Sequence, residues 1–163
     1  MKFKKAMPVG RQGFTLIELL VVIGILAVLL AITLVAINPA RQFSQANNTK
    51  RSSDVNALLN AIHQYAADNK GELPAGIPDT TAGAAVIGSN TAGGQVDICA
   101  SLVTTYLAAL PVDPLTNSGT PVKDCAAVAG YDTNYTVVQS TTDNRITVAA
   151  PAAELSAVIS VTR

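Results

Sequence analysis

Hydrophobic residues form one long uninterrupted run near the start of the chain, from Leu19 to Ile37. Thr33 is the only conventional polar side chain among these 19 residues. At about 1.5 Å of rise per residue, a helix over this run would span roughly 28 Å, close to the hydrocarbon thickness of a bilayer. Basic residues precede it, and no acid occurs among the first 13 residues. The pattern predicts a membrane-spanning helix with its N-terminus in the cytoplasm and the remainder outside.

The pattern changes after Pro39, where polar residues dominate up to Asp54 and an apolar stripe follows. Proline lacks a backbone N–H, so Pro39 should kink or locally unwind the helix. The stripe has the i, i+3, i+4, i+7 spacing of an amphipathic helix, and a stop signal follows at residues 69–71. We expect one long helix over residues 14–70, broken near Pro39. The apolar positions of the stripe are Val55, Leu58, Leu59, Ile62, Tyr65 and Ala66.

Shorter elements are predicted for the remainder of the chain. Residues 72–96 are rich in Gly, Thr, Ala and Pro and have no clear period, which indicates a loop. Residues 99–110 have apolar positions at helical spacing, which predicts a short helix that ends at Pro111. Three antiparallel strands should pack one face on the apolar stripe, which gives an α+β fold class. The strand candidates are residues 134–139, 145–150 and 155–161.

The charges are distributed unevenly along the chain. Eleven Lys and Arg balance eleven Asp and Glu, but four of the basic residues precede Gly13. Beyond Gly13, seven basic residues accompany eleven acids, a formal charge of −4. The chain has seven aromatic residues and no Trp, so it offers neither the basic stripe nor the stacking surface of a dedicated nucleic-acid site. Lys50 and Arg51 are interpreted as an exposed helical patch, or as ion-pair partners for acids of another molecule.

The two cysteines, Cys99 and Cys125, lie in the part predicted to be outside the membrane, where disulfides persist. We expect them to pair. In the chain-entropy model, closing a loop of this size stabilises a small domain by about 3 to 4 kcal/mol. The alternative is two buried free thiols. A metal site is not expected, because two cysteines and the distant His63 do not supply four clustered ligands.

No catalytic arrangement is apparent in the sequence. His63 follows Ile62 on the predicted helix, with Asp68 five residues further on, and is interpreted as a partly exposed helical residue. Gly93 and Gly94 indicate a turn and not a phosphate-binding loop. We therefore predict that the protein is not an enzyme and has no cofactor.

The order of features around the apolar run differs from that of an ordinary secretory signal. Such a signal has small residues after its apolar core, where a peptidase removes the core. Here the small residue is Gly13, which precedes the run, so a cut there would leave the apolar helix on the product. Phe14-Thr-Leu-Ile-Glu18 follows directly. This order resembles the type IV prepilin and pseudopilin family over residues 8–37.

The resemblance implies that a prepilin peptidase cuts between Gly13 and Phe14 and methylates the new amine of Phe14. It also implies that Glu18 pairs with the N-terminal ammonium of a neighbouring subunit. A carboxylate within an apolar helix costs about 3 kcal/mol in lipid unless it finds a partner. Because mispairing would leave a charge unpaired in a dry core, the pair would set the register of a filament. The alternative places Glu18 at the headgroup boundary of a simple signal anchor, bonded to water.

On this basis the chain divides into four segments. Residues 1–13 would be a leader peptide and residues 14–38 a transmembrane and filament-core helix. Residues 39–71 would be an amphipathic helix and residues 72–163 a small globular head with an antiparallel sheet. The resemblance thus implies a pilin-like lollipop, in which the long N-terminal helix packs on the sheet.

The segment Leu110-Pro-Val-Asp113-Pro, with the later Tyr131 to Tyr135, is similar to a pattern in major pseudopilins and some pilins. In those proteins the loop after Asp-Pro can hold calcium. The spacing of the oxygen ligands here is not a ligand-loop signature, and the insertion 117–129 departs from the pseudopilin loop. The sequence therefore favours a turn at Asp113 with the other acids solvated. The calcium alternative would use Asp113, Asn117, Asp124 and Asp132.

The leading hypothesis is a structural subunit of a type IV pilus-like, homo-oligomeric filament. The subunit would wait in the lipid of the cytoplasmic membrane, meet the prepilin peptidase, and be extracted by a pilus or secretion assembly platform and its motor. Its head would then lie at the cell surface or in the periplasm. One alternative is a pseudopilin of a type II secretion or DNA-uptake system. Another is an uncleaved, signal-anchored surface domain with a binding role.

Overall fold

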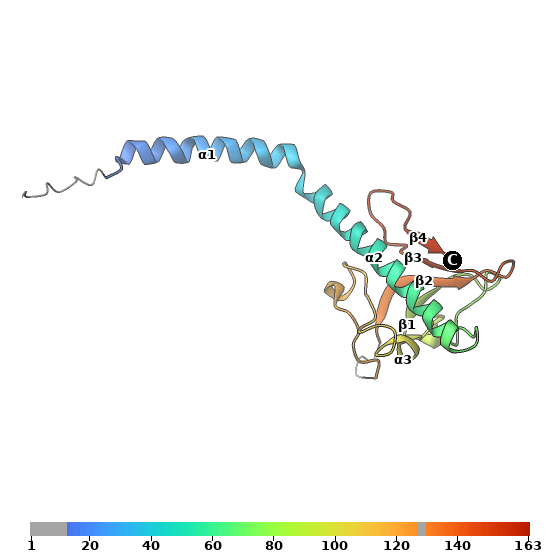
Figure 1. The fold of residues 1–163 in the computed structure, drawn as a ribbon. Helices are drawn as coiled ribbons and strands as arrows, with labels where there is room; N and C mark the ends of the chain where they lie inside the picture. The colour runs from blue at the N-terminus through green and yellow to red at the C-terminus, as the bar shows by residue number, and fades with distance from the viewer. Residues whose placement is uncertain (1–12, 127–129) are drawn as a thin grey trace, which may run out of the picture. The chain divides into compact units, whose positions relative to one another are not determined.

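The computed structural model of the protein describes residues 13–126 and 130–163. The predicted leader therefore lies outside the described residues, except for Gly13. Contacts within the chain divide it into two units, with the boundary between Pro39 and Ala40. Helix α1 belongs to the first unit, and the second contains the sheet (Figure 1).

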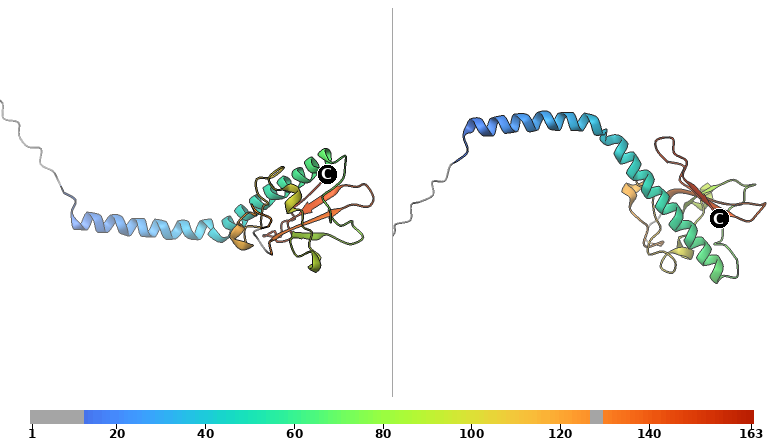
Figure 2. Two further views of the ribbon diagram at one scale, coloured as in Figure 1. Left: turned by 90° about the horizontal axis from the view of Figure 1, so that it is seen from below. Right: turned by 45° about the horizontal axis from the view of Figure 1, so that its top comes forward.

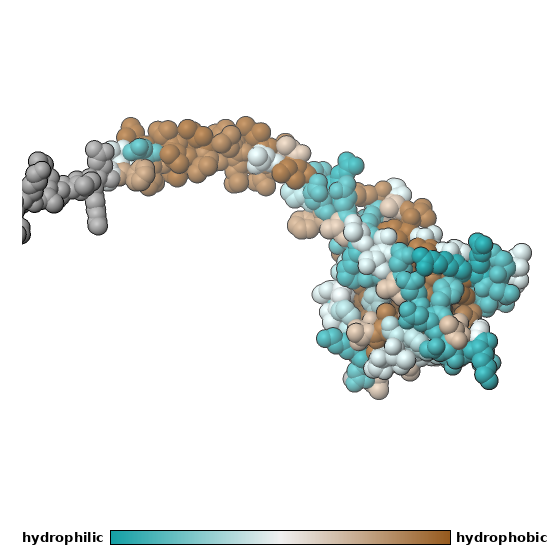
Figure 3. Space-filling model, viewed as in Figure 1, coloured by the Kyte–Doolittle hydropathy of each residue, from teal (hydrophilic) through white to brown (hydrophobic). Residues whose placement is uncertain are grey.

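Helix α1 spans Leu16–Ile37 and is apolar on every side. Its 22 residues are long and apolar enough to cross a membrane. Within the part of the chain that the structure describes, none of its side chains is buried, and its surface is hydrophobic almost throughout (Figure 3). A helix of this kind needs lipid or other helices around it.

Helix α2 spans Pro39–Asp68 and begins directly after a break in the backbone. Asn38 separates it from α1 in a left-handed conformation, with φ 45° and ψ 80°. The residue before a proline disfavours the helical region, whereas proline itself is tolerated in a first turn, where its missing N–H has no helical partner. Asn38 therefore ends one helix and Pro39 begins the next. At the far end, left-handed Lys70 and Gly71 follow the last helical residue.

The second unit contains a four-stranded antiparallel sheet in the order β1-β2-β3-β4. Val137 of β2 pairs with Ala85 of β1 and with Val148 of β3, and Val148 pairs in turn with Val161 of β4. Burial alternates along β2 and β3, as expected for a sheet with one packed face. The strands are Ala85–Gly88, Asp132–Gln139, Ile146–Ala149 and Ser160–Thr162.

The packed face of the sheet and the apolar stripe of α2 form one hydrophobic core. Figure 2 shows α2 running along the sheet. Side chains from α2 enter the core at helical spacing, and side chains from β2 and β3 enter it alternately. The residues at the centre of this core are Val55, Leu58, Leu59, Ile62, Tyr135, Val137, Ile146 and Val148. The predicted α+β fold class is therefore confirmed.

The sheet differs in two places from the sequence prediction. Strand β1 lies within residues 72–96, which were predicted to be a loop. It has four residues, too few to reveal a period, and it is paired by β2 from far along the chain. The predicted strand 155–161 is also wrong in extent, because only Ser160–Thr162 is extended in the sheet. Leu155 and Ser156 are left-handed, each with φ 57°, and cannot continue a ladder.

The predicted helix over residues 99–110 is wrong in length. Helix α3 covers only Cys99–Leu102, and Val103 is already extended, with φ −72° and ψ 144°. Val103 begins a run of three β-branched residues, which lose side-chain freedom in a helix and favour extended backbone. Two further single turns, η1 at Thr91–Gly93 and η2 at Asn117–Gly119, complete the elements of the described chain.

A disulfide joins Cys99 and Cys125, as the sequence analysis predicts. The two Cα atoms are 5.7 Å apart and 26 positions apart in the chain. Cys99 is fully buried in the hydrophobic core. The bridge therefore ties the irregular segment after α3 to the core.

The substitution Cys99→Ser should lower the melting temperature of the full chain in detergent by about 10 °C, because it reopens the loop in the unfolded state. Circular dichroism would measure the change. Reduction of the wild-type protein should have the same effect, and Ala100→Ser, at an exposed neighbouring position, should have little. An unchanged melting temperature for Cys99→Ser would refute a stabilising role for the disulfide.

Candidate functional site

The segment that begins α1 has an exposed, extended start and a capped first turn. Gly13, Phe14 and Thr15 precede the helix. The Oγ1 of Thr15 accepts a hydrogen bond from the backbone N–H of Glu18 at 3.2 Å, so Thr15 satisfies one of the unpaired donors of the first turn. Thr15 and Glu18 have the spacing of a capping box. That signal is present in the sequence, but the sequence analysis did not use it.

Glu18 lies in the first turn of α1, where the helix dipole favours a negative charge. Glu18 is exposed, as are Gly13 and Phe14. An added Cβ at Gly13 would meet no atom within 4 Å among the described residues. The peptide bond between Gly13 and Phe14 is therefore outside the helix and unobstructed by the described part of the chain.

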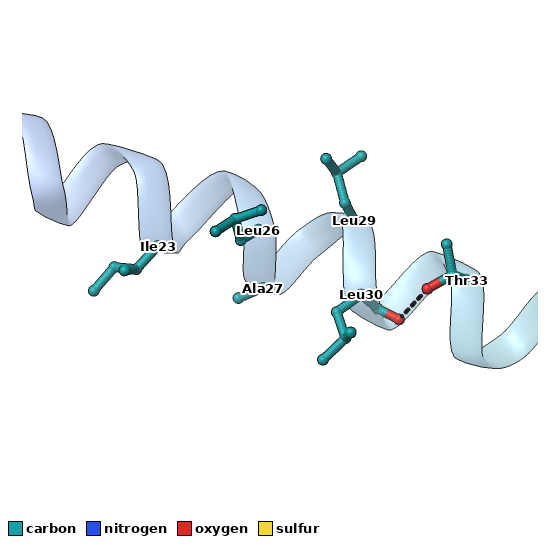
Figure 4. Close-up of a pocket in the computed structure, with 6 residues that line it drawn as sticks. All are labelled: Ile23, Leu26, Ala27, Leu29, Leu30 and Thr33. Carbon is teal, nitrogen blue, oxygen red and sulfur yellow. Dashed lines mark hydrogen bonds between the residues drawn. The ribbon is translucent and has the colours of Figure 1, made fainter.

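The surface of α1 has shallow apolar grooves between its longer side chains. One of them contains Ala27, whose short side chain lies among Ile23, Leu26 and Leu30 (Figure 4). At the end of this groove, the Thr33 hydroxyl donates to the Leu30 carbonyl at 2.9 Å. Thr33 therefore satisfies its polar atom within its own helix. Grooves and ridges of this kind are the surfaces through which helices interdigitate.

Comparison with known proteins identifies this segment. Residues 10–34 match the family model described as the prokaryotic N-terminal methylation motif. The chain carries a prepilin-type motif. It is a structural, pilin-type motif and not an enzymatic one. With the apolar α1, the prepilin-type motif fits a membrane-anchored single-pass protein. Searches of curated proteins and of solved structures found no match to the chain.

The second unit contains a buried ion cluster that the sequence analysis missed. Arg51 of α2 is fully buried. Its Nε and Nη2 donate to the two carboxylate oxygens of Asp113, at 2.6 and 3.1 Å. Its Nη1 donates to Glu154 at 2.8 Å and to the Asn48 side chain at 3.0 Å. The interpretation of Arg51 as an exposed patch, or as a partner for another molecule, is wrong because two acids of its own chain surround it.

The opposite charges of Arg51 and Asp113 compensate each other within this cluster. Asp113 is also fully buried, so its bidentate contact with Arg51 compensates two charges that water cannot reach. The hydrogen bond to Asp113 raises the pKa of Arg51, although burial opposes this. No local sequence pattern could reveal this pair, because Arg51 and Asp113 are 62 positions apart.

Glu154 is bound along about two turns of α2. Its carboxylate accepts hydrogen bonds from Ser44 at 2.8 Å and from Asn47 at 2.9 Å, in addition to the one from Arg51. The Asn48 side chain donates to the Glu154 carbonyl at 2.7 Å and accepts from its N–H at 2.9 Å. The hydrogen bonds from Asn47, Arg51 and Ser44 hold the pKa of Glu154 below its ordinary value. The loop between β3 and β4 is thereby attached to α2.

A second polar cluster adjoins the first. The hydroxyl of buried Tyr135 donates to Asp54 at 2.8 Å, and Lys50 forms an ion pair with the same oxygen at 2.7 Å. Burial raises the pKa of Tyr135 far above its ordinary value, and the hydrogen bond to Asp54 adds to this. Lys50 also donates to the Val112 carbonyl at 3.0 Å. Lys50 and Asp54, on either side of Arg51 in the sequence, therefore attach Val112 and Tyr135 to α2.

The candidate calcium ligands are not brought together. Asp113 is occupied by Arg51, and Asp132 accepts hydrogen bonds from Gln95 and from the Asn134 backbone. Within residues 13–126 and 130–163, no three acids, histidines or cysteines cluster as metal ligands. Asp113 is therefore an ion-pair partner of Arg51, and the calcium alternative through Asp113, Asn117, Asp124 and Asp132 stays a prediction. His63 lies half-buried on α2.

The substitution Arg51→Met should lower the free energy of unfolding by about 3 to 5 kcal/mol, because Asp113 would remain buried without its partner. Denaturation of the full chain in detergent would measure this. The double variant Arg51→Met with Asp113→Leu should recover part of the loss. Lys50→Met removes a half-exposed ion pair on the next residue and should change stability by less than about 1 kcal/mol. Equal effects at positions 50 and 51 would refute a stabilising role specific to the buried pair.

Proposed function

We propose that this protein is a structural subunit of a type IV pilus-like filament. The observation that supports the proposal is the prepilin-type motif at residues 10–34, joined to a helix whose apolar side chains are all exposed in a single copy. Such a surface is unstable in water. The membrane covers it before assembly, and neighbouring subunits cover it afterwards.

Processing removes the basic leader. The prepilin peptidase cuts between Gly13 and Phe14, at an exposed peptide bond that precedes α1. The cut retains α1 on the product, and methylation at Phe14 follows. The removed segment contains four basic residues and no acid, so the mature subunit acquires a net negative charge. The basic leader also supports an orientation with the N-terminus in the cytoplasm and the sheet outside.

Assembly packs the α1 helices of many subunits into a common core. Glu18 then lies in a dry environment, where an unpaired carboxylate is unfavourable. Its partner is the N-terminal ammonium of Phe14 in a neighbouring subunit. Because only the correct axial offset brings the two charges together, Glu18 sets the register of the filament. A platform and motor in the cytoplasmic membrane extract the subunit, and the heads remain at the cell surface or in the periplasm.

Intact-mass and N-terminal analysis of the protein from membranes tests the processing step. The expected product begins with N-methylated Phe14. Gly13→Val should retain the leader, because it replaces a small residue at the cut with a branched one. Gly24→Val, which changes a glycine within α1, is the matched control and should be cut normally. A wild-type protein that begins at Met1 without a methyl group would favour an uncleaved surface domain and exclude the filament.

Replacement of the acid tests assembly separately. Glu18→Val should be inserted in the membrane and cut, but should enter filaments poorly, because the neighbouring ammonium loses its partner. Electron microscopy of shed fibres and immunoblotting of the sheared fraction would measure incorporation. Thr33→Val is the control, since the Thr33 hydroxyl bonds only within α1 in the described structure, and it should assemble normally. Wild-type levels of filament from Glu18→Val would refute the register role.

A further inference from the structure

The chain between β3 and β4 makes an excursion that adds nothing to the hydrophobic core. We call residues 151–158 of this loop the strap; Figure 1 shows it beside α2. None of its residues is buried, and none has an apolar side chain in the core or packed against it. An open hollow is lined by Ala157 of the strap and by Ser52 and Asn56 of α2. Because apolar burial does not hold the strap in place, polar contacts must do so.

One strap residue, Glu154, makes these contacts. Its carboxylate accepts hydrogen bonds from Ser44, Asn47 and Arg51 of α2. Its backbone N–H and C=O both bond to the side chain of Asn48. Within the described chain, the other strap residues form no hydrogen bond to another element. Glu154 is therefore the single polar attachment of the strap to α2.

The backbone is strained directly after this attachment. Leu155 and Ser156 are consecutive left-handed residues, each with φ 57°, a conformation that favours glycine or asparagine. They are the central residues of a tight turn in which the Ala157 N–H donates to the Glu154 carbonyl at 3.1 Å. Such conformations persist only where the surrounding structure enforces them. The hydrogen bonds of Glu154 therefore hold the strap against a backbone preference for another conformation.

Release of the strap would leave the rest of the second unit paired and packed. The Nε and Nη2 of Arg51 would keep the Asp113 carboxylate, and its Nη1 would keep the side-chain oxygen of Asn48. The buried guanidinium would thus retain a countercharge. The hydrophobic core would lose no member, because the strap contributes none. A segment of this kind can open without the free-energy cost of global unfolding.

We propose that the strap opens and closes on α2 as a local unit while the rest of the head stays folded, and that the charge of Glu154 sets the balance. This inference goes beyond the proposed function and holds whether or not copies assemble. An ionised carboxylate accepts from all three donors, whereas protonation turns one of its oxygens into a donor that faces other donors. Opening uncovers the α2 side chains that hold this carboxylate.

The direction of the pH dependence follows from the groups that face Glu154. Arg51 is the charged side chain that binds it, and Asp113 binds the same guanidinium through other nitrogens. The hydrogen bonds from Asn47, Arg51 and Ser44 lower the pKa of Glu154 in the closed strap. In the open strap the carboxyl has its ordinary value. Closure is therefore most favoured above that ordinary pKa and is lost as the pH falls through the lowered one.

Hydrogen exchange of the full chain in detergent, read by mass spectrometry, tests the strap. The N–H groups of Glu154 and Ala157 are hydrogen-bonded when it is closed. Glu154→Gln keeps the size of the side chain but removes its charge, and should speed exchange in the strap by about tenfold. Exchange in β2 and β3 should not change. Glu72→Gln, the same change at an exposed acid outside the strap, is the matched control and should behave as wild type.

A second variant and a second measurement separate the charge from the fold. Ser44→Ala removes one donor and keeps the charge, so it should speed exchange in the strap less than Glu154→Gln does. Spin labels on Val158→Cys and Gln64→Cys, both exposed, measure the distance from the strap to α2 while the native cysteines stay in their disulfide. We expect one narrow distance near neutral pH and a broad distribution in acid. With Glu154→Gln the distribution should be broad at every pH.

Three results would overturn the proposal. The first is exchange in the strap of Glu154→Gln that is as slow as in wild type. The second is equal acceleration in the strap and in β2 and β3, because the strap would then open only when the whole head unfolds. The third is a wild-type label distance that stays narrow in acid, which would exclude control by the charge of Glu154.

Discussion

The ion pairs of the buried Arg51 guanidinium are the interactions on which the second unit depends. It lies on α2 and binds Asp113 and Glu154, which come from two segments far along the chain. Both acids lie outside the named helices and strands of the described chain. Because a buried charge must be paired, each acid has one favourable place. The polar part of α2 therefore organises the loops, while its apolar part organises the sheet through Val55, Leu58 and Ile62.

The two units differ in how their apolar side chains are covered. Helix α1 has an apolar surface that nothing in the described chain covers, so its stability depends on lipid or on other copies. The unit from Ala40 onward has its own core, a disulfide and internally paired charges. In the proposed filament, such a head would fold before the copies assemble. Under the same proposal, the apolar helix would pass from lipid to a bundle of equivalent helices without a change in the head.

Much of this organisation follows from local patterns. The apolar run, the stop at Gly71, the strands around Val137 and Val148 and the α+β class depend on periodicity and on turn residues, which the sequence displays directly. The prepilin-type motif is likewise a contiguous string. Strand β1 escaped prediction because four residues show no period. The helix predicted over residues 99–110 was too long. The prediction relied on the helical spacing of apolar residues and did not take into account the β-branched run that begins at Val103.

The sequence by itself determined the apolar helix, its basic flank, the glycine before it and the amphipathic stripe beyond Pro39, because each is a property of neighbouring residues. Only the tertiary structure decided that Arg51 is buried and that Asp113 binds it. The same is true of Glu154, which attaches the loop before β4 to α2. The reason is physical: an ion pair acts across the distance between atoms, and sequence separation does not specify that distance. The chain must fold before a charge has its partner.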